Sequence, residues 1–271
     1  MKLRLPHILF IIFLALLVLP VNGSARRKGG KVEKGIVALN LVEPDMLAAK
    51  AKQEGTVLPI LAVNLEHKAK TDPRFREGID VSHYQGQIDW DQVAGSQLVS
   101  YVYLKATEGR DYVDDTYARN LVEARRVGLS VGSYHFYRPN VSWEEQFQNL
   151  TTLVKPGEQD LVPMIDIEHR GHVSEAKFIA DIKKFLLQVE QHYGKKPLLY
   201  TYQNFYNKHF KGLFQDYHWM IAKYQENEPL LEDGRDFIMW QYTQSGSVPG
   251  VDGNVDRSCI MGNFTLDVLK Q

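Results

Sequence analysis

Residues 161–168 read Leu161-Val162-Pro163-Met164-Ile165-Asp166-Ile167-Glu168. The short apolar run is typical of a buried strand, and two carboxylates follow at its end, one residue apart. Because alternate side chains of a strand share a face, Asp166 and Glu168 are expected to project in the same direction. Carboxylates crowded at an apolar site cannot all stay ionised, so one keeps its proton near neutral pH. A glycosidase uses such a pair, although two solvated acids at a strand end are the plainer alternative.

Strand-like and helix-like segments alternate along the chain from Arg76 onward. The strand signals are apolar runs at residues 78–82, 99–104, 130–137, 162–167, 197–202, 218–222 and 237–242, with a weaker one near 254–256. Helical patterns cover 114–127, 142–154, 174–193 and 204–210, with a short one after Asp89. Ser142 and Glu145 predict a capping box at the start of 142–154. The order predicts an α/β fold, a modified β/α barrel with five strand–helix units followed by three further strands.

Acidic residues recur where the predicted strands end. One lies in the first strand, two end the fourth and one lies in the last: Asp80, Asp166, Glu168 and Asp256. The active site of a β/α barrel lies at the C-terminal ends of its strands, so these acids are expected to meet at one mouth. Taken singly, each is more often ordinary surface charge, but their convergence favours a catalytic site.

From about Arg76 to Leu269 the chain resembles glycoside hydrolase family 25, the lysozymes that act as N-acetylmuramidases. The resemblance rests on motifs in the family's order: Gly78-Ile79-Asp80-Val81-Ser82-His83-Tyr84-Gln85-Gly86-Gln87-Ile88-Asp89-Trp90, Lys105-Ala106-Thr107-Glu108-Gly109, Gly132-Ser133-Tyr134-His135-Phe136, Asp166-Ile167-Glu168, Tyr200-Thr201-Tyr202, Trp240-Gln241-Tyr242 and Val251-Asp252-Gly253-Asn254-Val255-Asp256. After the last acid the family often has Asp-Leu-Asn, whereas this chain has Asp256-Arg257-Ser258. The acid is kept, and the side chains that support it are open to question.

The resemblance implies hydrolysis of the β-1,4 bond from N-acetylmuramic acid to N-acetylglucosamine in peptidoglycan glycan strands. Glu168 is the expected general acid and then base. Asp166 is expected to raise the pKa of that acid and to hold the substrate's 2-acetamido group, while Asp80 and Asp256 keep the acids in register and stabilise positive charge on the sugar. Attack by the acetamido oxygen would give substrate-assisted retention, and a carboxylate nucleophile remains the alternative.

Six side chains are candidates for contact with sugar rings: Lys105, Tyr112, Tyr134, Tyr200, Trp219 and Trp240. Aromatic residues make up 11% of the chain, and many lie at strand ends, where they could stack on sugars. Core packing is the alternative for each of them.

Charge and motif content narrow the classes of function. The chain has 32 basic and 33 acidic residues and no long basic stripe on the barrel segments, which argues against a nucleic-acid partner. The sequence has neither a Gly-rich phosphate loop nor a nucleophile elbow, and no cofactor is predicted. His169 and His172 form an H-x-x-H pair that could recruit zinc, but such loop pairs are normally solvated and no metal is predicted. Cys259 is the only cysteine, so an intrachain disulfide is excluded.

The N-terminus has the pattern of an export signal. Met1-Lys2-Leu3-Arg4 precedes an apolar run from Ile8 to Leu19, which is followed by Gly23-Ser24-Ala25. This predicts a signal peptide over residues 1–25 and an exported protein, in the cell envelope or outside the cell. The run is short for a bilayer span, so an uncleaved membrane anchor is the lesser alternative. Residues 26–75 are predicted to be a poorly ordered spacer, and 76–271 the catalytic barrel.

A second class of function fits the same fold. A glycan-binding barrel without catalysis could tether a protein at the cell envelope. Such a binder would tolerate a neutral residue in place of Asp166 or Glu168, whereas all of the acids are present here. The sequence therefore favours the enzyme.

Overall fold

The computed structural model describes residues 77–271, and the predicted signal peptide and spacer lie outside them. One sheet has the order β1-β9-β8-β7-β6-β5-β4-β2-β3, and an additional pairing of β1 with β2 closes it into a barrel. The strands are β1 (Glu77–Val81), β2 (Tyr101–Glu108), β3 (Tyr112–Val113), β4 (Ser130–Phe136), β5 (Met164–Asp166), β6 (Leu198–Tyr202), β7 (Trp219–Ala222), β8 (Met239–Gly246) and β9 (Val255–Ile260). The ring strands are parallel except β9, and β3 pairs with β2 outside the ring.

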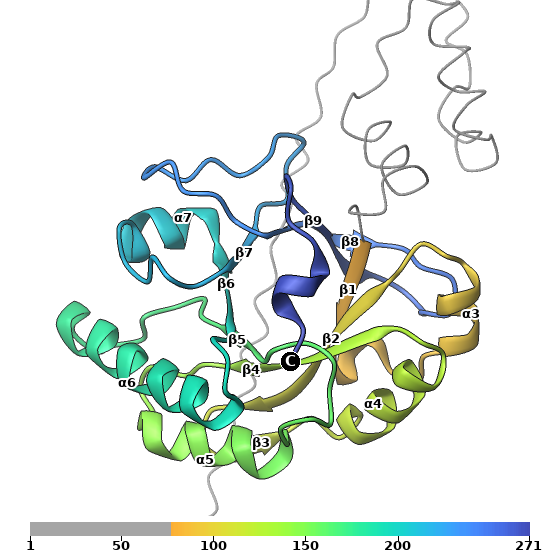
Figure 1. Cartoon of the computed structure of the whole chain (residues 1–271), viewed down its shortest axis with the longest axis horizontal. Coiled ribbons are helices and arrows are strands. Elements are labelled where there is room, and N and C mark those ends of the chain that lie inside the picture. The colour runs from red at the N-terminus through yellow and green to blue at the C-terminus, as the bar shows by residue number, and fades with distance from the viewer. Residues whose placement is uncertain (1–76) are drawn as a thin grey trace, which may run out of the picture. The chain divides into compact units, whose positions relative to one another are not determined.

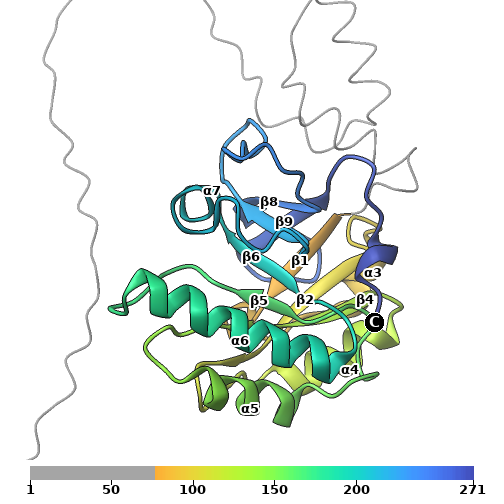
Figure 2. The ribbon, with the colours of Figure 1, turned by 60° about the vertical axis from the view of Figure 1, so that its left-hand side comes forward.

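A helix follows each of the first five ring strands. These helices are α3 (Trp90–Gly95), α4 (Tyr117–Arg126), α5 (Trp143–Leu153), α6 (Glu175–Tyr193) and α7 (Gln203–Phe205), which continues as the π-helical η3 (Tyr206–Phe210). Loops connect β7, β8 and β9, so the predicted barrel of five strand–helix units and three further strands is confirmed. Helices α5 and α6 lie side by side outside the sheet (Figure 1, Figure 2). Within residues 77–271, no helix is both long and apolar enough to cross a bilayer.

Capping residues explain where the longer helices begin and end. The Ser142 hydroxyl accepts a hydrogen bond from the Glu145 backbone N–H at 3.2 Å, which is one half of the predicted capping box. Ser174 does the same for Lys177 at the start of α6. That helix ends at Gly194, whose φ of 74° suits a residue without a side chain.

Alternation along the strands separates two apolar layers. In β5 and the residues after it, Ile165 and Ile167 face outward and belong to the large cluster under the helices, together with Phe185 of α6. Met164 faces inward and belongs to the cluster that includes Tyr101 and other side chains of the barrel interior. Asp166 therefore also faces inward, because it follows Met164 by two residues.

Two glycines make room for large rings inside the barrel. A Cβ at Gly78 would lie 2.0 Å from the Tyr101 ring, and one at Gly132 would lie 2.3 Å from the Tyr103 ring. Both rings are fully buried. They belong to the apolar cluster of the barrel interior, together with Met164.

The C-terminal segment covers the end of the barrel at which the parallel strands begin. It includes the 3-10 helix η4 (Leu266–Leu269), and Leu269 packs in the interior cluster. The Val162 N–H, just before β5, donates to the Leu269 carbonyl at 2.7 Å. Figure 1 shows this segment crossing the middle of the ring. With this end closed, the open end lies at the C-terminal ends of the parallel strands.

Candidate active site

A cavity of about 220 Å³ lies at the C-terminal ends of the strands. Its lining includes all of the predicted catalytic acids: Asp80, Asp166, Glu168 and Asp256. Asp80 and Asp256 are direct partners in the register of β1 and β9. Asp166 ends β5, and Glu168 lies two residues further on the same face. The structure therefore brings together four acids that are up to 176 residues apart in the sequence.

The acids form a buried pair and a more open pair. Asp80 and Asp166 are only 8% and 7% exposed, whereas Glu168 and Asp256 are half-buried. Within residues 77–271, one oxygen of each buried acid, Asp80 Oδ2 and Asp166 Oδ1, is inaccessible to solvent and has no hydrogen-bond partner. A buried carboxylate oxygen needs a donor or a proton, so both oxygens are suited to accept from a bound molecule.

Burial raises the pKa of every acid in the cavity, and the charge of a neighbouring acid adds to this for Asp80, Asp166 and Glu168. Burial raises the pKa of Glu168 to about 7, with a further contribution from the charge of Asp256, and it raises the pKa of Asp256 to about 6. Burial, and then the charge of Glu168, hold the pKa of Asp166 well above its usual range. The pKa of Asp80 is also raised well above that range, first by burial and then by Asp256. The cluster therefore retains protons near neutral pH.

An amide network supports Asp80 from strand β8, which lies on the other side of β9 from β1. The Gln241 Nε2 donates to Asp80 Oδ1 at 2.8 Å. The Gln241 Oε1 accepts from the hydroxyls of Tyr200, at 2.8 Å, and Tyr224, at 2.7 Å. Gln241 was not among the predicted site residues, although it lies within one of the motifs.

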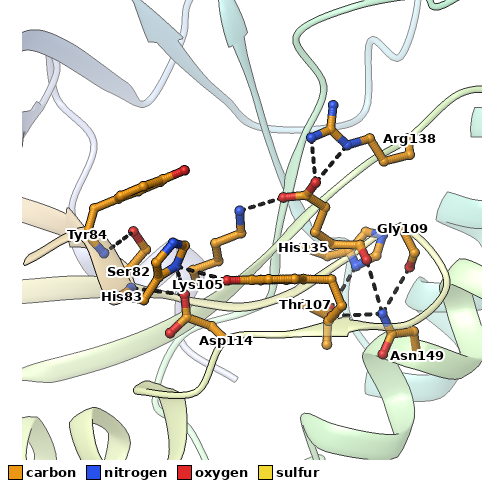
Figure 3. A network of polar contacts seen from close by, with 12 residues as sticks. Ser82, His83, Tyr84, Lys105, Thr107, Gly109, Asp114, His135, Arg138 and Asn149 are labelled. Carbon is orange, nitrogen blue, oxygen red and sulfur yellow. Dashed lines mark hydrogen bonds and ion pairs between the residues drawn. The ribbon is translucent and has the colours of Figure 1, made fainter. Parts of the chain in front are cut away.

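A bulge in β2 places a lysine and a glutamate on the same side of the strand. The register with β4 shifts between Lys105 and Thr107, so alternation restarts at this point. Lys105 Nζ consequently lies 2.6 Å from Glu108 Oε2, and Arg138 Nε donates to Glu108 Oε1 at 2.8 Å (Figure 3). Burial alone would raise the pKa of Glu108, but the hydrogen bonds from Lys105 and Arg138 hold it below its usual value. The Glu108 carboxylate therefore joins Lys105, which lines the cavity, to Arg138.

The rim beside β1 is held by a buried aspartate. Asp114 Oδ2 accepts from the His83 backbone N–H at 3.0 Å and lies 2.8 Å from His83 Nδ1 (Figure 3). The Tyr112 hydroxyl lies 2.9 Å from the same nitrogen. Tyr84, which follows His83 in the sequence, lines the cavity and is 81% exposed. Such a ring at the mouth of a polar cavity is suited to stack on a sugar.

The predicted sugar contacts fall into three groups. Lys105, Tyr134 and Tyr200 line the cavity. Tyr112 lies at the rim, 37% exposed, with Lys105 Nζ 5.1 Å from the centre of its ring.

Trp219 and Trp240 are corrections: both are 0% exposed and neither is among the residues that line the cavity. Their positions in the strands point them outward. Trp219 packs on Tyr206 and Phe210, and the Trp240 indole N–H donates to the Lys223 carbonyl at 2.9 Å.

The residues after Asp256 show how the departure from the family pattern is accommodated. Arg257 points outward and pairs with Glu77 of β1. Ser258 points inward, with its hydroxyl 2.9 Å from the Tyr101 hydroxyl. The serine thus joins the barrel interior below Asp256, and the arginine ties β9 to β1.

His169 lies against a cation rather than in a cluster of metal ligands. Its Nε2 is 3.1 Å from an Arg138 guanidinium nitrogen. Burial, and then the charge of Arg138, lower the pKa of His169. Among the side chains of residues 77–271, no group of three or more His, Cys, Asp or Glu is placed to hold a metal ion.

Comparison with known proteins gives a consistent result. The family described as "Glycosyl hydrolases family 25" matches residues 79–251. The protein YegX of Escherichia coli K12 is 34% identical over 189 residues, which cover 68% of this chain and 69% of that protein. Lysozyme M1 of Streptomyces globisporus is 30% identical over 201 residues, covering 69% and 68% of the two chains.

Solved structures with the same fold include two bacterial enzymes. The lysozyme from Streptomyces coelicolor superposes with a TM-score of 0.65 at 29% identity, covering 73% of this chain and 96% of that one. A family 25 glycosyl hydrolase from Bacillus anthracis gives a TM-score of 0.65 at 30% identity, covering 71% and 92%.

Proposed function

The chain belongs to glycoside hydrolase family 25, and we propose from this how its four carboxyl groups carry out the reaction. The protein is a lysozyme that hydrolyses the glycan strands of peptidoglycan, at the β-1,4 bond from N-acetylmuramic acid to N-acetylglucosamine. One observation carries the assignment of roles. Acids from β1, β5 and β9 meet in a single cavity, where each has a raised pKa.

Glu168 is the general acid. Its pKa of about 7 leaves a large protonated fraction at neutral pH, and it is the more accessible member of the Asp166–Glu168 pair. It donates its proton to the glycosidic oxygen as the bond breaks. The resulting carboxylate then takes a proton from the water that attacks the sugar.

Asp166 orients the 2-acetamido group of the substrate. Its Oδ1 is buried and lacks a donor among the described residues, and an amide N–H would supply one. A hydrogen bond to this N–H increases the negative charge on the acetamido oxygen, which attacks the anomeric carbon from the opposite side to the leaving group. Hydrolysis of the resulting ring gives net retention, and direct attack by a carboxylate is the alternative.

Asp80 and Asp256 stabilise the positive charge that develops on the sugar. Both line the cavity on the β1–β9 side, opposite the strand that carries the other two acids. An anion that is already in place stabilises such charge without reorganisation. Lys105, Tyr134 and Tyr200, with Tyr84 and Tyr112 at the rim, contact the sugars.

The protein is exported, since its substrate lies outside the cytoplasmic membrane. The support is the basic, apolar and small-residue pattern of residues 1–25, which predicts a mature N-terminus near Arg26. N-terminal sequencing of the native protein tests this. An intact Met1 in a membrane fraction would instead mean that the segment is an anchor.

Digestion of purified peptidoglycan, with mass spectrometry of the new reducing ends, tests the reaction. Muramic acid at those ends is the expected result. Glucosamine ends would mean a glucosaminidase. Retention of the protein on peptidoglycan without any product would favour the non-catalytic binder tethered at the envelope.

A further inference from the structure

Gln241 holds a fixed orientation because two tyrosines point at the same atom. Its side chain is buried, and its Oε1 accepts from both Tyr200 and Tyr224. The two N–H groups of the amide must therefore face the other way, and one of them meets Asp80 Oδ1 at 2.8 Å. A flipped amide would place its oxygen against the carboxyl oxygen, an arrangement that is favourable only if Asp80 carries a proton there.

The surroundings of Asp80 otherwise favour its protonated form. The carboxyl is buried, and the charged or titratable groups that face it are Asp256 on β9, Tyr101, Tyr103 and Lys105 on β2, Tyr134 on β4, and Asp166 and Glu168 at the end of β5. Lys105 is the cation that lines the cavity, and it is paired with Glu108. Within the described residues, the Gln241 amide is thus the group that donates a hydrogen bond to the Asp80 carboxyl.

We propose that Gln241 is a positioning residue, which keeps Asp80 Oδ1 an acceptor so that Asp80 serves as the anion of the cavity. This rests on the proposed function, in which Asp80 must be ionised to stabilise charge on the sugar. Tyr200 and Tyr224 lock the amide, which leaves Asp80 Oδ2 as the carboxyl oxygen without a partner among the described residues. An amide suits this role because it donates a hydrogen bond without adding a charge to a site already crowded with carboxylates.

The pH profile of kcat/KM on peptidoglycan fragments tests the proposal. Gln241→Met keeps the approximate volume and removes the donor, so the pKa of Asp80 rises. The acidic limb of the profile should move to higher pH by about 1 to 2 units, the effect of losing one hydrogen bond to a charged group. Tyr224→Phe removes one of the two locking hydroxyls and should move the limb in the same direction by less.

A matched control separates positioning from simple loss of structure. Tyr242→Phe removes a phenol hydroxyl from the adjacent residue of β8, where it donates to Glu77 rather than to the network. Both limbs of the pH profile of Tyr242→Phe should coincide with those of the wild type. If Gln241→Met does not fold, Tyr224→Phe carries the test.

A uniform fall in rate with unshifted limbs in both network variants would overturn the proposal. The wild-type digest distinguishes this outcome from failure of the proposed function. Muramic acid ends together with unmoved limbs contradict only the role of Gln241. Absence of those ends contradicts the assignment as a muramidase, whatever the limbs do.

Discussion

Asp80 and Asp256 lie directly opposite each other on the antiparallel strands β1 and β9, and both line the same cavity. Like charges in this cross-strand position repel and destabilise a sheet. Burial and then the charge of Asp256 raise the pKa of Asp80, and burial raises the pKa of Asp256 to about 6. A destabilising pair of this kind at a barrel mouth is typical of a site selected for chemistry rather than for stability.

Asp256→Asn should move the alkaline limb of the pH profile of kcat/KM to lower pH. The pKa of Glu168 is raised by burial and, next, by the charge of Asp256. Without that charge Glu168 loses its proton at lower pH, so the alkaline limb of kcat/KM should move down from about 7. Rate measurements across pH 4 to 9 check this. An alkaline limb that stays in place would show that another group donates the proton.

Glu168→Gln should stabilise the fold at alkaline pH while it abolishes most activity. The folded pKa of about 7 lies above the usual 4.5, so the carboxyl favours folding fully below pH 4.5, and this contribution is lost as pH rises through 7. The neutral amide avoids this loss. Urea unfolding should show a gain of about 1 to 3 kcal/mol at pH 8 and little difference at pH 4. A variant less stable than the wild type at pH 8 would contradict the raised pKa.

His135 should make the protein sensitive to acid. It is buried, with Nδ1 2.8 Å from the Thr107 hydroxyl, and burial lowers its pKa from 6.5 to about 4. The unfolded chain therefore binds a proton that the folded chain does not, and stability is lost as pH falls from 6.5 to 4. In His135→Gln, the fall in unfolding free energy over this range should be smaller by on the order of 3 kcal/mol. The exposed His172→Gln is the control, and equal slopes in both variants would exclude this cause.

Gly78→Ala should destabilise the barrel interior. The new methyl group would lie 2.0 Å from the fully buried Tyr101 ring. Relief requires movement of the ring or the strand, so a loss of about 3 kcal/mol or more is expected in thermal or urea unfolding. Gly95→Ala, on α3 with nothing within 4 Å of the added carbon, is the control and should be neutral or stabilising. Similar stability of the two variants would mean that the interior is loosely packed.

Most of the barrel could be predicted from sequence because its strands are long apolar runs and its helices carry their own caps. The run at 218–222 became β7 (Trp219–Ala222), and Ser174 marks the start of α6. The short β3 could not be predicted, since two residues have no periodicity and depend on pairing with β2. The bulge at Lys105 to Thr107 was equally hidden, because strict alternation would send Glu108 to the opposite face.

The candidate site was predictable where chemistry and strand ends coincide. The convergence of the acids followed from the rule that the active site of a β/α barrel lies at the C-terminal ends of its strands. The prediction that Trp219 and Trp240 contact sugars is wrong because it rested on their aromatic rings. It did not consider which face of the strand each side chain occupies. Their neighbours Met220 and Gln241 face inward, so the tryptophans face outward. Gln241 was overlooked because an uncharged amide in an apolar run has no strong signal, although a lone polar residue in a buried strand needs a partner.

The division of labour between Glu168 and Asp166 is tested most directly by activated substrates. Glu168→Gln removes the acid, so turnover on glycan strands should fall by about 10² to 10⁴. An aryl glycoside with a good leaving group needs little protonation and should recover much of this loss. Asp166→Asn removes the charge that polarises the acetamido group, so ring closure stays slow with either substrate. The account predicts rescue of Glu168→Gln and not of Asp166→Asn, and equal rescue of both variants, or of neither, would contradict it.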